Sequence, residues 1–274
     1  MNELIFNTDV ITSKTNSTIV KIAKLNNKKY RNEEKLFVCN GIKLFLEAVN
    51  FGANIKYIVI NNQTKFDNDI IKQIKNCQNS GVNILCVTDG VYSKLTEEIS
   101  PQGIITVCSF FDKKHRFFAN VENEYCDKKI MLFESIRDPG NVGTIIRNAA
   151  AFGVDRLIFS QDCVDIYSPK VIRSAMGAVF KMNIDVVENF NSAIKSLKKS
   201  GKRVLSAALG RKSLVLGEHK LSNNDVIIIG NEGHGISNEV LDMSDDTIFI
   251  PMQENTESIN AAIASAIFMW ELTK

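Results

Sequence analysis

Short apolar runs alternate with amphipathic stretches along this chain. In the first part, four runs have the length and apolar content of buried strands, and they lie at Leu36–Cys39, Tyr57–Ile60, Val82–Val87 and Ile104–Val107. Two stretches between them, Gly41–Phe51 and Asp69–Asn79, repeat apolar residues at helical spacing, and a glycine follows each of them closely. The pattern predicts a small α/β unit.

A second series of strand-like runs follows a charged stretch at 113–129. The runs lie at Ile130–Phe133, Arg156–Phe159, Arg203–Ala207, Asp225–Ile229 and Thr247–Ile250. Helical patterns separate most of them, which favours a mainly parallel sheet covered on both faces. The sequence therefore predicts an α/β chain with a first domain at 1–112, a linker at 113–129 and a second domain at 130–274.

Three polar segments of the second domain lie close to the ends of strand-like runs. They are DPGNVGTIIR at 138–147, GNEGHG at 230–235, and IPM at 250–252 followed by ESIN at 257–260. Open α/β sheets gather their ligand sites outside the carboxyl ends of the strands. Three such segments in one domain therefore predict one composite site.

The first polar segment predicts a turn, a helix and a cation. Pro139 and Gly140 form a tight turn, and Asn141 is expected to cap the helix that follows. The apolar face of this helix consists of Val142, Ile145, Ile146 and Ala149. Arg147 projects from the opposite side, where a guanidinium can bind a phosphate or form an ordinary surface salt bridge.

The second and third segments combine glycines with polar side chains. Gly230, Gly233 and Gly235 let a ligand approach the main chain, although a plain connecting turn also fits the pattern. Glu232 has no evident structural role and can either bind ribose hydroxyls or orient another polar group. Glu257, Ser258 and Asn260 then precede an apolar helix. Their alternative role is to cap the N-terminus of that helix. One side of that helix carries Ile259, Ile263, Ala266, Ile267 and Trp270.

In this order, the three segments resemble the motifs of the SpoU (TrmH-like) family of RNA ribose 2′-O-methyltransferases, within the SPOUT superfamily. The resemblance runs through FESIRDPGNVGTIIRNAAAFG (133–153), SPKVIRSAMGAVFKMNI (168–184), IIIGNEGHGIS (227–237) and IPMQENTESINAAIASAI (250–267). The first part, at 12–48 and 100–107, is similar to the family's L30e-like substrate-binding domain.

The resemblance implies a second domain with a deep trefoil knot that binds S-adenosylmethionine (AdoMet), and a site completed in a homodimer. The implied cofactor contacts are Gly210, Gly230, Asn231, Ile250, Met252, Ser258, Ile259, Asn260 and Ala262. The implied catalytic residues are Arg147, with Asn141, Glu232, Ser258 and Asn260 in support. The implied reaction is methylation of a ribose 2′-hydroxyl. The N-terminal domain favours 23S ribosomal RNA (rRNA) as the substrate, because many members that modify rRNA carry such a domain.

Basic residues are concentrated near the start of the chain, although the formal net charge is only +2. They can neutralise RNA phosphates, or they can form an ordinary solvated helix face. The candidate RNA contacts are Lys14, Lys21, Lys24, Lys28, Lys29 and Arg31, together with Arg147 of the second domain.

Other function classes lack their signatures. The 6 cysteines and 3 histidines show no zinc spacing, so neither disulfides nor a metal site is expected. No signal peptide or membrane-length run is evident, and a cytoplasmic protein without a membrane partner is expected. The G-x-G-x-x-G pattern of a dinucleotide-dependent oxidoreductase is missing. Two alternatives remain: the same reaction on tRNA, and a non-catalytic RNA-binding protein, which AdoMet binding would distinguish from an enzyme.

Overall fold

The computed structural model describes residues 5–111, 128–210, 213–253 and 258–274, and the chain forms two compact units. The expected linker at 113–129 lies almost wholly outside the described residues. The first unit runs to residue 112 and also contains Tyr167–Phe180, a segment that the sequence assigns to the second domain. Within the first unit, the Tyr167 ring stacks on Phe110 with their centroids 3.8 Å apart, and aromatic packing thus holds this segment there.

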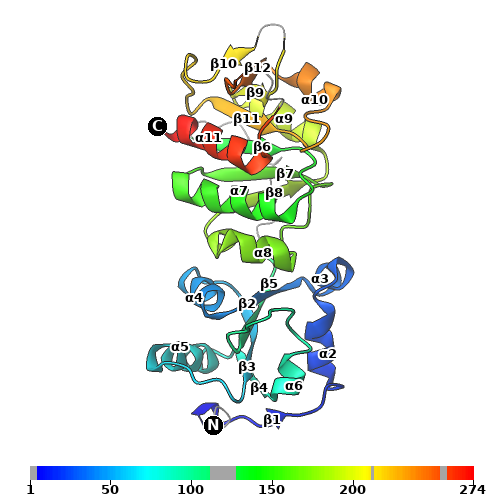
Figure 1. The fold of residues 1–274 in the computed structure, drawn as a ribbon, viewed down its shortest axis with the longest axis vertical. Coiled ribbons are helices and arrows are strands. Elements are labelled where there is room, and N and C mark those ends of the chain that lie inside the picture. The colour runs from blue at the N-terminus through cyan, green and yellow to red at the C-terminus, as the bar shows by residue number, and fades with distance from the viewer. Residues whose placement is uncertain (1–4, 112–127, 211–212, 254–257) are drawn as a thin grey trace. The chain divides into compact units, whose positions relative to one another are not determined.

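The first unit is built on a mixed sheet of five strands in the order β1-β4-β3-β5-β2 (Figure 1). The strands are β1 (Val10–Ile11), β2 (Leu36–Asn40), β3 (Ile55–Asn61), β4 (Asn83–Val87) and β5 (Ile104–Ser109). The helices are α2 (Ser17–Lys24), α3 (Lys28–Glu34), α4 (Ile42–Asn50), α5 (Asn68–Asn79), α6 (Asp89–Tyr92) and α8 (Pro169–Ala175), with a 3₁₀ turn at Ala178–Phe180. β5 runs antiparallel to both neighbours, whereas β4 is parallel to β3.

Successive residues of β3 show how the core of the first unit is divided. Val59 packs with Ile19 and Ile22 of α2 on one face of the sheet, whereas Ile58 and Ile60 pack with α4 and α5 on the other. All of these side chains are buried, as the alternation of a strand between two helical layers requires.

The second unit is built on seven strands in the order β10-β12-β9-β11-β6-β7-β8, and every pairing is parallel. Its strands are β6 (Ile130–Phe133), β7 (Arg156–Ser160), β8 (Asn183–Val187), β9 (Arg203–Ala207), β10 (Leu214–Val215), β11 (Asp225–Ile229) and β12 (Asp246–Phe249). Its helices are α7 (Pro139–Phe152), α9 (Phe190–Lys199), α10 (Asn238–Met243) and α11 (Ala261–Thr273). The predicted parallel sheet is thereby confirmed, and β8 and β10 are strands that the pattern did not predict.

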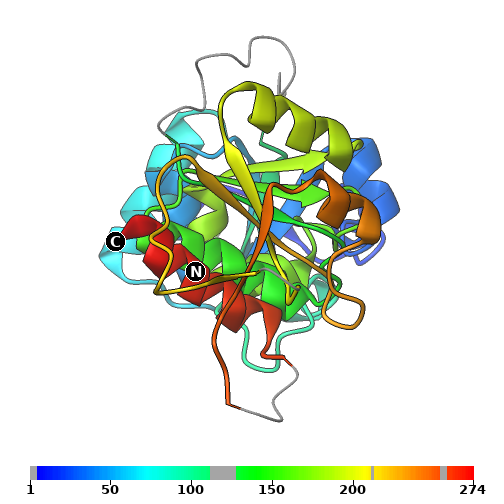
Figure 2. The same cartoon turned by 90° about the horizontal axis from the view of Figure 1, so that it is seen from above.

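Helices cover both faces of this parallel sheet. Figure 2 shows α7 and α11 on one side of it and α9 and α10 on the other. Leu132 of β6 and Ile228 of β11 pack with Leu197 of α9, and all three are fully buried. Strands buried on both faces are continuous apolar runs, which is why the sequence pattern located them.

α11 has two apolar faces, of which one is buried. Phe268, Met269 and Leu272 are buried, and the helix lies beside α7 (Figure 1). Ile263 and Trp270, two of the residues that the sequence pattern places on one side, face outward and are 56% and 53% exposed. A helix that is apolar all round normally has both faces covered.

Candidate functional site

The first turn of α7 brings a polar side chain to the carboxyl ends of the central strands. Asp138 caps this helix, since its Oδ1 accepts a hydrogen bond of 2.8 Å from the Asn141 backbone N–H, and Pro139 occupies the first helical position. The prediction that Asn141 is the cap is therefore wrong. With Asp138 in that role, the buried Asn141 side chain bonds to neighbouring segments instead.

Asn141 joins all three polar segments. Its Nδ2 donates to Glu232 Oε1 over 2.9 Å, and its Oδ1 accepts from Asn260 Nδ2 over 2.9 Å. Asn260 in turn caps α11, because its Oδ1 accepts from the backbone N–H of Ala262. Segments that lie 91 and 119 residues from Asn141 in the sequence thus meet in one continuous chain of hydrogen bonds.

Glu232 is held as a carboxylate. Burial works against its ionised form, but hydrogen bonds from the Asn141 side chain and from backbone N–H groups outweigh this effect and hold the pKa of Glu232 below its usual value. The backbone donors include Arg137 at 3.3 Å and Asp138 at 3.4 Å. An ionised carboxylate can only accept hydrogen bonds, so the site presents a fixed acceptor.

A second polar cluster fixes the loop that supplies these backbone donors. Asp162 accepts hydrogen bonds from Ser160 over 2.6 Å, from Arg137 Nη2 over 2.7 Å and from Ser135. Burial opposes the charge on Asp162, yet the two serine hydroxyls and Arg137 lower its pKa below the usual value. The sequence pattern did not predict this cluster, although Asp162 lies three residues after the strand-like run Arg156–Phe159.

The Gly230–Gly235 loop closes on itself. The backbones of Asn231 and Gly235 exchange two hydrogen bonds of 2.9 Å, and the Asn231 side chain donates to the Ser135 carbonyl over 2.7 Å. A Cβ added at Gly230 would collide with the backbone of Gly235 and Ile236. Glycine is therefore required at this position for steric reasons.

The second and third polar segments line a cavity of about 470 Å³, and no residue of the first segment is part of that lining. Eight of the predicted site residues line it, namely Gly230, Asn231, Glu232, Ile250, Met252, Ser258, Ile259 and Asn260. Gly210 and Ala262 do not line it; their N–H groups bond to Ser213 and Asn260. Positions 254–257 of the third segment lie outside the described residues.

Most of the apolar lining of the cavity was not predicted from the sequence. Leu209, Phe249 and Phe268 line it, and Leu209 is 70% exposed. Leu209 follows the predicted strand Arg203–Ala207, so its place at the carboxyl end of a strand was a usable signal. An exposed large apolar side chain at a cavity is typical of a site for a partly apolar ligand.

Arg147 lies apart from this cavity. Its side chain is exposed on α7 and does not line the cavity. Within the described residues it has no hydrogen-bond or ion-pair partner, so the salt-bridge alternative from the sequence finds no support there.

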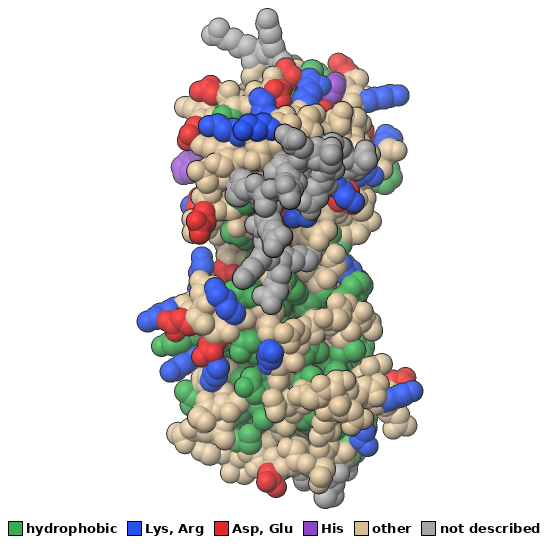
Figure 3. Space-filling model, turned by 180° about the vertical axis from the view of Figure 1, so that it is seen from behind, with side chains coloured by type: hydrophobic (Ala, Val, Ile, Leu, Met, Phe, Trp, Pro, Cys, Tyr) green, Lys and Arg blue, Asp and Glu red, His purple; other side chains and the backbone are tan. Residues whose placement is uncertain are grey.

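The basic residues of the first unit differ in their surroundings. Arg31 is buried, and its Nη1 donates to the carbonyls of Leu25 and Asn26 over 2.8 Å. This guanidinium stabilises the turn between α2 and α3, so its prediction as an RNA contact is wrong. Lys24 and Lys29 lie 5.1 and 5.9 Å from the ring centroid of Tyr30. Figure 3 shows Lys and Arg side chains gathered on the side of this unit that carries α2 and α3.

Lys14, Lys21 and Lys28 complete the predicted set of RNA contacts. Lys14 and Lys28 are exposed, whereas Lys21 forms an ion pair of 2.6 Å with Glu34. The exposed cations are therefore the available ones for a polyanionic ligand.

The described residues contain neither a candidate metal site nor a helix that could cross a membrane. Across 5–111, 128–210, 213–253 and 258–274, no group of three or more potential ligands is placed to hold a metal ion. The cysteines of these ranges are buried free thiols, and Cys126 lies outside them. No helix in the same ranges has the length and apolar character to cross a membrane.

Comparison with known proteins identifies the family. Residues 128–270 match the SpoU rRNA Methylase family, and residues 16–106 match the MRM3-like substrate binding domain. The chain is 29% identical over 262 residues to the 23S rRNA (guanosine(2553)-2′-O)-methyltransferase RlmP of Bacillus subtilis, covering 96% of this chain and 98% of that one. It is 27% identical over 288 residues to the mitochondrial rRNA methyltransferase 3A of Danio rerio, covering 88% and 64%.

Solved structures agree with this match. The crystal structure of an AdoMet-bound rRNA methyltransferase from Sinorhizobium meliloti is similar with a TM-score of 0.83 and 27% identity, covering 96% of both chains. The family match spans more than half of the chain and includes all three polar segments and Arg147. The chain therefore belongs to the SpoU rRNA methylase family.

Proposed function

We propose that this chain transfers the methyl group of AdoMet to a ribose 2′-hydroxyl of 23S rRNA in the cytoplasm. The observation that carries the proposal is the Asn260–Asn141–Glu232 hydrogen-bond chain beside the 470 Å³ cavity, because it joins three distant segments around one site. The Bacillus subtilis relative is named as a 23S rRNA 2′-O-methyltransferase, and the similar Sinorhizobium meliloti structure contains AdoMet. Both support the proposal.

The cavity suits AdoMet in size and lining. Its volume lies in the usual range for small-molecule sites, about 300–1,000 Å³. Leu209, Phe249 and Met252 offer apolar surface to an adenine ring, while Asn231 and Glu232 offer polar groups. When bound, AdoMet supplies a methyl group that its sulfonium already activates. We propose that the predicted cofactor residues hold it: those that line the cavity contact it directly, whereas Gly210 and Ala262 support the lining through their backbone bonds to Ser213 and Asn260.

The rest of the chemistry falls to this chain's own side chains. A ribose 2′-hydroxyl is a poor nucleophile, and accurate positioning can lower the barrier by about 7–11 kcal/mol. We assign Arg147 to binding an RNA phosphate and stabilising the charge that develops on the ribose oxygen, since a guanidinium does not lose its proton in proteins. Glu232, oriented by Asn141, and Ser258 then hold the ribose hydroxyls.

We further propose that a homodimer completes the site through the outward faces of α7 and α11. The exposed Ile263 and Trp270 support this, since they leave an apolar helix face uncovered. Arg147 is exposed on the neighbouring α7 and does not line its own cavity, which suits a role in the site of a second copy.

The uncovered helix face offers a direct test of the dimer. Ile263→Asp should convert dimers into monomers in sedimentation velocity without unfolding the chain, because the side chain is exposed. Ile99→Asp is the matched control, since Ile99 is exposed on a loop of the first unit and its replacement should leave the dimer intact. Dimers in both variants would contradict an interface on α11.

The trefoil knot is also proposed. β12 lies between β10 and β9 in the sheet, and the chain then reaches α11 beside α7. A chain that returns across earlier strands in this way is compatible with a knot, although such folds are rare.

The first experiment is methyl transfer from radiolabelled AdoMet to protein-free 23S rRNA, 16S rRNA and bulk tRNA, followed by nuclease mapping. Label at a 2′-O-methyl nucleotide of 23S rRNA alone is the expected outcome. Label in tRNA would replace the substrate assignment. AdoMet binding without label would point to an assembled ribosomal particle, and no AdoMet binding would favour a non-catalytic RNA-binding protein.

A further inference from the structure

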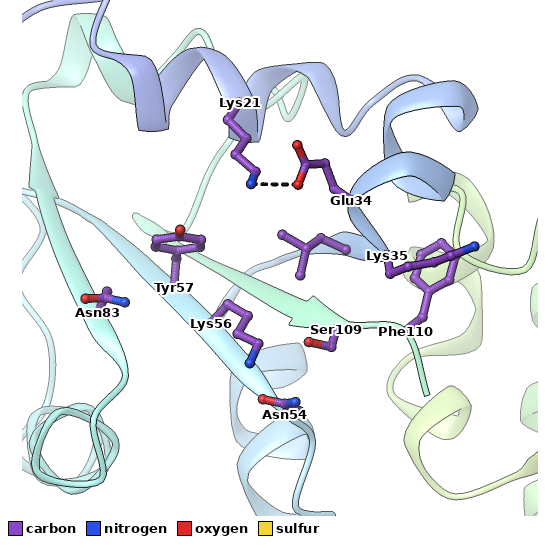
Figure 4. Close-up of a pocket in the computed structure, with 10 residues that line it drawn as sticks. Lys21, Glu34, Lys35, Asn54, Lys56, Tyr57, Asn83, Ser109 and Phe110 are labelled. Atoms are coloured by element: carbon purple, nitrogen blue, oxygen red, sulfur yellow. Dashed lines mark ion pairs between the residues drawn. The ribbon is translucent and has the colours of Figure 1, made fainter. Parts of the chain in front are cut away.

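The first unit carries a separate open pocket of about 470 Å³. It lies at the end of the sheet where β2, β3 and β4 begin and β5 ends. Side chains from these strands and from α2 line it (Figure 4). Ligand sites of α/β sheets normally lie at the carboxyl ends of parallel strands, so the sheet topology does not explain this pocket.

Two backbone irregularities place lysines at this pocket. Lys35 ends α3 in the left-handed conformation, with φ of 53°, which is uncommon for a residue other than glycine. The pairing of β3 with β5 shifts register between Ile55 and Tyr57, so Lys56 is the extra residue of a bulge. Bulges re-aim side chains, and here the exposed residues Lys35 and Lys56 both line one pocket. The Lys35 ammonium lies 5.7 Å from the centroid of the Phe110 ring, which lines the same pocket.

The charges around the pocket leave two cations without a carboxylate. Lys21 and Glu34 neutralise each other, and their hydrogen bond raises the pKa of Lys21 (Figure 4). Within the described part of the chain, neither Lys35 nor Lys56 has an ion-pair partner. The pocket therefore has a net positive charge, which favours an anionic ligand.

Uncharged polar groups of the same pocket are also available to a ligand. The side chains of Asn54, Asn83 and Ser109 have no hydrogen-bond partner within the described residues. The half-buried Tyr57 adds an aromatic ring to the lining (Figure 4). Amide and hydroxyl groups can bond to base edges or a ribose, and aromatic rings stack on unpaired bases.

We propose that this pocket binds one nucleotide of a single-stranded segment of the RNA substrate. Lys35 and Lys56 hold its backbone phosphates, and Asn54, Asn83 and Ser109 bond to its base or ribose. The inference rests on the proposed function for the nature of the RNA, but it concerns a site on the first unit that shares no lining residue with the cofactor cavity. It predicts that the first unit anchors RNA at a defined pocket and not only through its exposed lysines.

Salt-dependent binding to the full chain tests this proposal. The probe is a fluorescent single-stranded RNA of mixed sequence, about 12 nucleotides long. Each phosphate contact to single-stranded RNA contributes about 0.7 to the slope of log K against log salt. Lys35→Gln combined with Lys56→Gln should therefore reduce that slope by about 1.4. The matched control is Lys72→Gln with Lys75→Gln on α5, both exposed on the same unit, which should keep the parent slope.

The outcomes separate this pocket from the catalytic site. Equal slopes for the two double variants, or no binding of the oligonucleotide by the parent, would overturn the pocket. Uridine monophosphate at the same nucleotide concentration should not displace the RNA; displacement would assign the pocket to a free nucleotide. AdoMet binding should be unchanged in all variants. If the parent binds the oligonucleotide through Lys35 and Lys56 but methylates neither free RNA nor an assembled ribosomal particle, the proposed function fails and the pocket stands.

Discussion

At the scale of single residues, Arg147 separates cofactor binding from chemistry. Because Arg147 does not line the cofactor cavity, Arg147→Ala should leave AdoMet affinity unchanged. Loss of a charge-stabilising group should lower kcat by about 10²-fold or more. The kcat of Arg147→Lys should lie between those of the parent and Arg147→Ala, because an ammonium keeps the charge but lacks the planar fork of a guanidinium. Lys195→Ala, on the opposite face of the sheet, serves as a surface-charge control. Full activity of Arg147→Ala in a methyl-transfer assay would remove the arginine from the mechanism.

The lowered pKa of Glu232 predicts how the stability of the fold depends on pH. Its pKa in the folded chain lies below the ordinary value of about 4.3, so its hydrogen bonds stabilise the fold above that value. This contribution is lost as the pH falls through the lowered pKa. Asn141→Ala removes the side-chain donor and should move the pKa of Glu232 back upwards, which a carboxyl ¹³C NMR titration would measure.

The same substitution has a cost in stability. Asn141 is buried, and its loss removes one hydrogen bond from Glu232 and leaves the Asn260 side-chain N–H group without its partner, which should cost about 1–3 kcal/mol of unfolding free energy. Asn148→Ala on the same helix is the matched control and should change neither quantity. An unchanged Glu232 titration in Asn141→Ala would show that the backbone donors alone set its pKa.

At the scale of elements, the Gly230–Gly235 loop depends on one glycine more than on another. A Cβ at Gly230 meets backbone atoms of Gly235 and Ile236, whereas a Cβ at Gly233 has its nearest neighbour, Asn231 Oδ1, at 3.6 Å. Gly230→Ala should therefore weaken AdoMet binding by about tenfold or more and lower Tm, because the loop must shift. Gly233→Ala should retain binding. Calorimetric titration of both variants with AdoMet would measure the two affinities. Equal affinities would refute the steric argument.

The elements also show how far sequence patterns reach. Ile130–Phe133 and Asp225–Ile229 were predicted with their observed bounds, because strands buried on both faces are unbroken apolar runs. The helix cap at 138 was missed, since Asp138 and Asn141 are both capping residue types and the choice depends on Pro139 at the first helical position. Arg31 was misjudged because the carbonyls that bind it come from the turn at Leu25 and Asn26.

At the scale of the whole molecule, the proposed dimer predicts complementation between inactive variants. If Arg147 serves the cavity of a second copy, mixed dimers of Arg147→Ala and Asn260→Ala chains contain one intact site. Random exchange between the two variants should then restore about a quarter of the parent activity. Methyl transfer by the mixture would be compared with each variant alone. No recovery, with exchange verified by sedimentation of labelled chains, would place Arg147 in the site of its own chain.

The bond between Asn260 and Asn141 has a consequence for biosynthesis. The two residues are 119 positions apart, and each belongs to the first turn of a helix or to its cap. A growing chain that has completed α7 must therefore wait for most of the second unit before Asn141 gains its last partner. Long-range contacts of this kind make folding slow, because the loop entropy is lost before the contact forms. A nascent chain on the ribosome thus passes through a period in which most of its sheet has formed but its proposed active site has not.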